Sequence, residues 1–118
     1  MKNLRYNEPP VVHGDGLQTR DFVSVEDVVA ATILTLDSET ASGAYNIATG
    51  VETTIGSLAT TLISITGQTS TPTNAPARPG DIRRSVGDIH RAKDELGYSP
   101  RTNLNEDLRN LWNWYLTT

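Results

Sequence analysis

The stretch G-D-G-L-Q-T-R-D-F-V-S-V-E-D-V-V-A, residues 14–30, decides how the chain begins to fold. Asp15-Gly16 is a turn signal, and residues 20–24 follow it as a short predicted strand. Ser24 is a typical helix N-cap, with Asp27 three residues later as its capping-box partner. The stretch therefore predicts a turn, a strand and a helix in direct succession.

The remaining sequence continues this mixture of short strands and helices. The helix that starts after Ser24 has apolar residues at i, i+3, i+4 and i+7 spacing, and we expect this face to be buried: Val25, Val28, Val29, Thr32, Ile33 and Leu36. Three more helices are predicted at 54–66, 88–96 and 104–116, and further strands at 10–13, 44–48 and 82–86. About four helices with three or four short strands make a small α/β, α+β-like domain, whose strands have too few neighbours to form a good sheet alone.

Length and composition narrow the possible functions. The 118 residues make one small domain and contain no cysteine, which excludes disulfides and thiolate metal sites. The net charge of −4 argues against nucleic acid as a partner. No apolar window approaches the length of a membrane span, and no leader peptide is visible, so we expect a cytoplasmic protein that does not enter membranes.

Two arginines far apart in the sequence are the strongest candidates for binding. Arg20 follows the glycine turn, and Arg78 lies between two prolines in a connector predicted to be extended. Guanidinium groups donate paired N–H groups to phosphates, so two of them approaching from different loops suit a diphosphate. The alternatives are an ion pair of Arg20 with Asp27 or another carboxylate, and a plain surface role for Arg78.

Three further residues are candidates for the same site. Asp81 could accept hydrogen bonds from ribose hydroxyls, or it could simply be a turn residue. Val12 and His13 could line a base pocket, although a lone histidine is more often a surface or core residue. His13 and His90 have no ligand-spaced acids around them, so no metal site is predicted.

Catalytic signatures are missing from these 118 residues. Gly14-Asp15-Gly16 lacks the third glycine of a dinucleotide fingerprint, with Thr19 in its place. No tyrosine is followed by a lysine four residues later. No catalytic residue is therefore assigned, and no cofactor site is expected within the chain.

Five motifs in order resemble the C-terminal, substrate-binding portion of the NAD-dependent epimerase/dehydratase family, the extended short-chain dehydrogenases. They are residues 14–28, G-A-Y-N-I-A-T-G at 43–50, A-R-P-G-D-I at 77–82, D-I-H-R-A-K-D-E-L-G-Y-S-P at 88–100, and L-N-E-D-L at 104–108 in a helix that continues to W-N-W. Within the family the chain is most similar to the UDP-glucose 4-epimerase group.

The resemblance implies roles for the candidate residues. Arg20 and Arg78 match arginines that hold the substrate pyrophosphate, and Asp81 matches an acid near the ribose. Val12 and His13 fall where the family lines its base pocket, usually with Tyr or Phe. The 44–48 strand would belong to the family's NAD-binding sheet, and that domain is absent from residues 1–118.

These implications lead to three readings of the chain. It is the substrate-binding portion of a nucleotide-sugar epimerase or dehydratase, inactive alone; a non-catalytic nucleotide-sugar binding module; or an interaction domain whose site has decayed. The expected ligand is a UDP-hexose, and NAD is implied for full-length members only. Because the 44–48 strand would lack neighbours, we also expect a homo-oligomer, an unstable monomer or a separate NAD-binding domain as partner.

Overall fold

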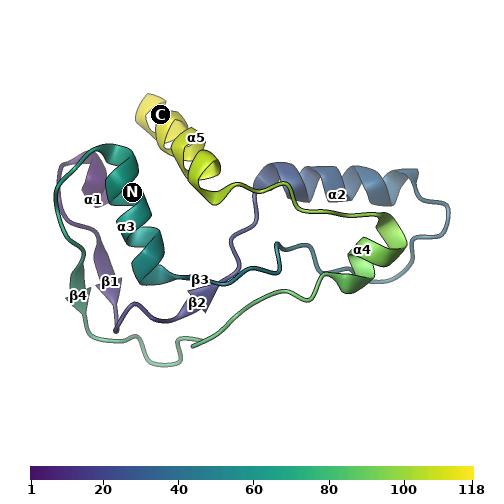
Figure 1. The fold of residues 1–118 in the computed structure, drawn as a ribbon, viewed down its shortest axis with the longest axis horizontal. Coiled ribbons are helices and arrows are strands. Elements are labelled where there is room, and N and C mark those ends of the chain that lie inside the picture. Colours follow the sequence, from purple (N-terminus) through teal and green to yellow (C-terminus); the bar gives the residue numbers. More distant parts are fainter.

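A computed structural model describes all 118 residues. The chain forms five helices and four short strands, in an arrangement that Figure 1 shows as two regions joined by extended segments. In chain order the elements are α1 Lys2–Arg5, β1 Val11–His13, β2 Thr19–Arg20, α2 Val25–Asp37, β3 Thr53–Thr54, α3 Ile55–Thr66, β4 Thr73–Ala75, α4 His90–Leu96 and α5 Leu104–Thr117.

The first region, called here the α3/α5 region, contains α1, α3, α5, β1 and β4 (Figure 1). Strands β1 and β4 pair in parallel, with Val12 opposite Asn74. The helices enclose a core of three buried residues, Leu4, Ile63 and Trp112. Segments from both ends of the sequence therefore share one core.

The second region, called here the α2/α4 region, contains α2, α4 and the extended residues 44–48. Its core is Ala31, Ala92, Leu96 and Tyr98, with Tyr45 and Ile47 packed against it. The antiparallel pair of β2 and β3 lies between the two regions in Figure 1. The chain consequently has two small cores, and its radius of gyration of 16.7 Å exceeds the roughly 13.5 Å of a compact domain of this length.

The predicted α/β class and most helix ends are confirmed. The side chains of Ser24, Thr54 and Asn103 accept backbone N–H bonds at the starts of α2, α3 and α5. Gly67 and Gly97 end α3 and α4 in the left-handed conformation that favours glycine. Local capping chemistry was thus sufficient to predict these boundaries.

Several predicted elements are wrong. Residues 44–48 and 82–86 are extended but pair with no strand, and the strand predicted over 20–24 ends at Arg20. Elements α1, β3 and β4 were not predicted from the sequence, and β4 lies within the segment expected to be an extended connector. Asp27 is not a capping-box partner, because its carboxylate accepts hydrogen bonds from the backbone of Arg101 and Thr102.

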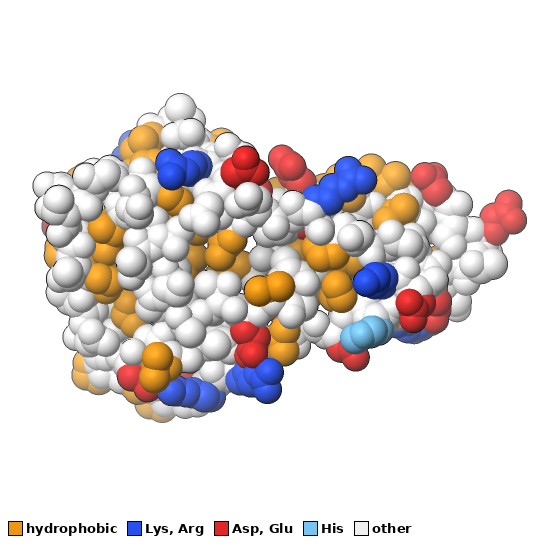
Figure 2. Space-filling model, in the orientation of Figure 1, with side chains coloured by type: hydrophobic (Ala, Val, Ile, Leu, Met, Phe, Trp, Pro, Cys, Tyr) orange, Lys and Arg blue, Asp and Glu red, His pale blue; other side chains and the backbone are white.

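The predicted buried face of α2 is also wrong for this chain. Its apolar side chains lie at the surface, including Val25 (73% exposed), Val29 (53%) and Ile33 (52%), whereas Ala31 and Asp27 are buried. Figure 2 shows apolar side chains at the surface over α2 and in the area between α2 and α5. None of the helices is long and apolar enough to cross a membrane.

Candidate functional site

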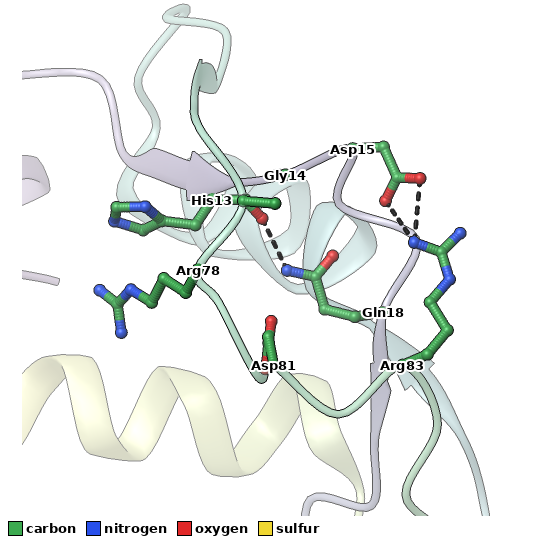
Figure 3. Close-up of a pocket in the computed structure, with 8 residues that line it drawn as sticks. His13, Gly14, Asp15, Gln18, Arg78, Asp81 and Arg83 are labelled. Atoms are coloured by element: carbon green, nitrogen blue, oxygen red, sulfur yellow. Dashed lines mark hydrogen bonds and ion pairs between the residues drawn. The ribbon is translucent and has the colours of Figure 1, made fainter.

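The candidate site lies where β1 ends beside the loop of residues 76–83. The Gly14 N–H donates to the Ala75 carbonyl at 2.9 Å, which continues the β1–β4 pairing to the start of this loop. Two adjoining cavities of about 220 and 280 Å³ open here. Both are lined by the same four residues, and Figure 3 shows them around the smaller cavity: His13, Gln18, Arg78 and Asp81.

Arg20 lines the larger cavity and is held in place by three contacts. Its Nη2 pairs with Asp81 Oδ1 at 2.6 Å, and its Nη1 donates to the carbonyls of Thr19 and Ile82. The ion pair that the sequence left open for Arg20 therefore exists, with Asp81 rather than Asp27. Because Asp81 is another candidate site residue, this contact joins β2 to the 76–83 loop across the cavity.

Arg78 lines both cavities and belongs to none of the five ion pairs of the structure. Its carbonyl accepts a hydrogen bond from the Asp81 N–H at 3.2 Å, and Gly80 has a φ of +77° in this tight turn. In Figure 3 the guanidinium of Arg78 and the ring of His13 extend from their backbones in the same direction. Arg78 thus supplies a positive charge that no carboxylate of the chain neutralises.

The two candidates on β1 lie on opposite faces of the strand. Val12 is buried, 4% exposed, beneath the site, and Val11 lines the larger cavity in its place. His13 faces the cavities, with its Nδ1 3.2 Å from the Pro76 carbonyl. A carbonyl can only accept, so in a neutral ring Nδ1 carries the proton and Nε2 is left as an acceptor.

Sequence reasoning missed Gln18 and the pair of Asp15 with Arg83. Gln18 is buried, and its Nε2 donates to the His13 carbonyl at 2.7 Å. Both oxygens of Asp15 accept from Arg83 Nη1, at 2.8 and 2.9 Å. The hydrogen bond from Arg83, aided by the Leu17 N–H, lowers the pKa of Asp15. Polarity within a turn was the only available signal, and it is too common to identify a site.

The chain's residues do not fit a dinucleotide. The Gly14–Gly16 turn leads into strand β2 and not into a helix, and the Gly56 N–H at the start of α3 already donates to the Gly16 carbonyl at 2.8 Å. A pyrophosphate of NAD is normally held at that junction of strand, glycine turn and helix. No group of three or more His, Cys, Asp or Glu side chains is placed to hold a metal ion.

Comparisons with known proteins find related sequences over most of the chain. The family model described as GDP-mannose 4,6 dehydratase matches residues 1–111. A UDP-glucose 4-epimerase of Mycolicibacterium smegmatis is 38% identical over 97 residues, covering 82% of this chain and 31% of that protein. A putative UDP-glucose 4-epimerase of Methanocaldococcus jannaschii is 34% identical, covering 92% of this chain and 34% of its own length.

Solved structures give the same result. UDP-glucose 4-epimerase of Thermotoga maritima with UDP-glucose has a TM-score of 0.87 at 36% identity, covering 98% of this chain and 37% of that one. UDP-N-acetylglucosamine 4-epimerase of Methanobrevibacter ruminantium, in complex with UDP-N-acetylmuramic acid, has a TM-score of 0.91 at 31% identity and the same coverage. UDP-glucuronic acid 4-epimerase of Bacillus cereus, with UDP-glucuronic acid and NAD, has a TM-score of 0.90 at 26% identity, covering 98% of this chain and 38% of that one.

The chain spans about a third of the length of the relatives it matches. The family model, however, covers nearly all of the chain, and the curated and structural matches name the same group of enzymes. This chain belongs to the GDP-mannose 4,6 dehydratase family of NAD-dependent epimerases and dehydratases, and it corresponds to the C-terminal portion of these proteins.

Proposed function

We propose that this chain binds the diphosphate of a nucleotide sugar, most readily a UDP-hexose, as the substrate-binding portion of an epimerase. The supporting observation is that Arg20 and Arg78, 58 positions apart in the sequence, line one cavity together with His13 and Asp81. A cavity with two guanidinium groups and few apolar residues suits a dianionic group. The relatives whose structures hold UDP-sugars add support through family membership.

Each residue has a distinct role in this proposal. Arg78 binds a phosphate first, because its charge has no partner within the chain. Arg20 binds the second phosphate and must share its guanidinium with Asp81, whose carboxylate can turn to the ribose hydroxyls. The His13 ring packs on the base or accepts from it through Nε2, and buried Val12 supports the strand that carries it.

The catalytic groups and NAD come from outside these residues. NAD supplies reversible hydride transfer in enzymes that bind it, and nothing in this chain's site performs that step. We propose that an NAD-binding domain packs against the exposed apolar face of α2 and the unpaired 44–48 segment, either on one polypeptide or in trans. A cytoplasmic location is part of the same proposal.

Isothermal titration calorimetry with UDP and UDP-glucose tests the binding role directly. We expect Arg78→Ala to weaken UDP binding by about 10- to 100-fold, the loss of a charge-assisted contact. Arg109→Ala is the matched control, since Arg109 is an exposed arginine on α5 outside the site. The absence of UDP binding, or equal losses in the two variants, would refute the proposal.

The Arg20–Asp81 ion pair supports one alternative, an interaction domain in which these side chains only hold the 76–83 loop. Such a domain would bind neither UDP nor inorganic pyrophosphate above the level of any surface arginine. Titration of both anions separates the two functions, because the proposed site binds UDP and loses that binding with Arg78.

A further inference from the structure

Asp21, directly after Arg20, gathers more hydrogen-bond donors than any candidate residue of the site. Its Oδ1 accepts from the Thr49 N–H at 2.8 Å and from the Thr49 hydroxyl at 2.6 Å. Its Oδ2 accepts from the Gly50 N–H at 2.9 Å and the Gly87 N–H at 3.2 Å. Burial opposes the charge on Asp21, but these bonds outweigh it and lower the pKa of the carboxyl.

The donors directly follow two segments that form no strand of their own. Residues 44–48 and 82–86 are extended without strand partners, and each leads directly into a donor of Asp21. A Cβ on Gly87 would lie 2.4 Å from that of Ala48, so the two segments are pressed together beside the carboxylate. Asp21 therefore links the two segments by accepting four hydrogen bonds on one carboxylate.

This anchoring also fixes the loop that carries two site residues. The segment after Asp81 is attached to the 19–21 segment at three points: Arg20 Nη1 to the Ile82 carbonyl, the Thr19 N–H to the Arg83 carbonyl, and Asp21 to Gly87. The first two bonds are made by Ile82 and Arg83, at the end of the loop. The third is made by Gly87, at the end of the segment that follows the loop. Without that third bond, the loop is held to the 19–21 segment only by the bonds at Ile82 and Arg83 and by the Arg20–Asp81 ion pair.

We propose that Asp21 is a positioning residue for the anion site, holding the loop of Arg78 and Asp81 at a fixed distance from Arg20. This inference rests on the proposed binding of a diphosphate. Asp21 does not touch the ligand; it lines neither cavity. Its contribution is preorganisation, because two guanidinium groups bind one diphosphate tightly only if their spacing is set beforehand.

The test uses a second aspartate that the chain builds in the same way. Asp27 also accepts two backbone N–H bonds and a threonine hydroxyl, from Arg101 and Thr102, but it joins α2 to the segment before α5, away from the site. In Asp21→Asn and Asp27→Asn alike, an amide N–H₂ faces backbone donors and repels them. The milder pair Thr49→Val and Thr102→Val removes one hydroxyl donor from each carboxylate.

We expect Asp21→Asn to weaken UDP binding about 10-fold or more by calorimetry, and Thr49→Val to weaken it less. Asp27→Asn and Thr102→Val should leave the affinity within about 2-fold, although their melting temperatures fall to a comparable extent. Equal affinities in the Asp21 and Asp27 variants, with UDP still bound by the parent chain, would overturn the inference and leave the proposed function intact.

A second measurement does not need a ligand. In the ¹H–¹⁵N spectrum of arginine side chains, we expect the hydrogen-bonded Arg20 guanidinium to give a slowly exchanging signal in the parent chain. We expect Asp21→Asn or Thr49→Val to shift this signal and speed its exchange, while Asp27→Asn leaves it unchanged. An Arg20 signal that is identical in all variants would refute the positioning role even if the parent chain failed to bind UDP.

Discussion

The two regions of this chain use their helices in opposite ways. In the α3/α5 region the facing helices bury the large apolar residues Ile63 and Trp112 against Leu4. In the α2/α4 region the core consists mainly of small residues and Tyr98, and the larger apolar residues of α2 face outward. Both cores consist of residues of this chain, but α2 contributes only Ala31 to the buried core of its region and leaves its larger apolar residues exposed.

The difference shows where a partner is needed. A helix with one apolar stripe must bury that stripe against another layer to be stable. The apolar face of α3 packs against α5. The outer apolar face of α2 packs against no other element of the 118 residues. The contrast gives physical support to the proposal that a separate domain covers α2 and the 44–48 segment.

The sharpest test of the comparison is a pair of tryptophans on α5. Trp112→Ala should destabilise the chain by about 3–5 kcal/mol, because it opens a cavity in the α3/α5 core. Trp114→Ala should change stability by less than about 0.5 kcal/mol, since Trp114 is 60% exposed. Urea unfolding followed by circular dichroism measures both. Similar losses in the two variants would mean that α5 packs differently in solution.

The attachment of α2 to the segment before α5 is tested by pH. Hydrogen bonds from Thr102 and Arg101 lower the pKa of Asp27, outweighing the opposing effect of burial. Because the folded-state pKa lies below the ordinary 3.8, the stabilisation is complete above pH 3.8 and is lost as pH falls through the folded value.

Asp27→Asn should therefore cost about 2 kcal/mol at neutral pH, the loss of hydrogen bonds to a buried charge. It should also flatten the decline of melting temperature with acid relative to the parent chain. Calorimetric melts from pH about 6 to about 2 show both effects. An acid limb of unchanged slope would indicate that Asp27 is solvated in the folded chain.

Features that depend on residues close together in the sequence were predicted, whereas features that depend on distant residues were not. The cap at Ser24 acts within three residues and was predicted correctly, as were the helix starts near Thr54 and Leu104. The 44–48 strand was wrong because a strand exists only through a neighbour, and none is supplied here. The same holds for β4, a polar Thr-Asn-Ala segment that is a strand only because β1 lies beside it.

The same distinction applies to the candidate site: several of its residues were identified from the sequence, but the contacts among them were not. The sequence singled out Arg20, Arg78, Asp81 and His13, and the structure places all four on one cavity; whether they bind a diphosphate stays a prediction. It gave no indication that Arg20 pairs with Asp81 or that Asp21 receives four hydrogen bonds. Those contacts join residues 28 to 66 positions apart, and their chemistry is that of any exposed turn.

In the α2/α4 region, substitution of Tyr98 tests whether water reaches the core. The side chain is 1% exposed, and its hydroxyl donates to the Ala48 carbonyl at 2.9 Å. Tyr98→Phe should destabilise the chain by about 1–1.5 kcal/mol, because the buried carbonyl loses its donor. Tyr6→Phe, at a 67% exposed position, is the control and should have no measurable effect. A neutral Tyr98→Phe would mean that water reaches Ala48.

The smallest expected effect on stability comes from the outer face of α2. Ile33→Ser should change the free energy of unfolding by less than about 0.5 kcal/mol, because Ile33 is 52% exposed. The same substitution should reduce self-association in light scattering, since it removes apolar surface from a face that copies of the chain can share. A loss above about 1 kcal/mol with unchanged association would show that this face is already covered by the chain itself. In that case the two regions would share a single core, and the need for a partner domain at α2 would disappear.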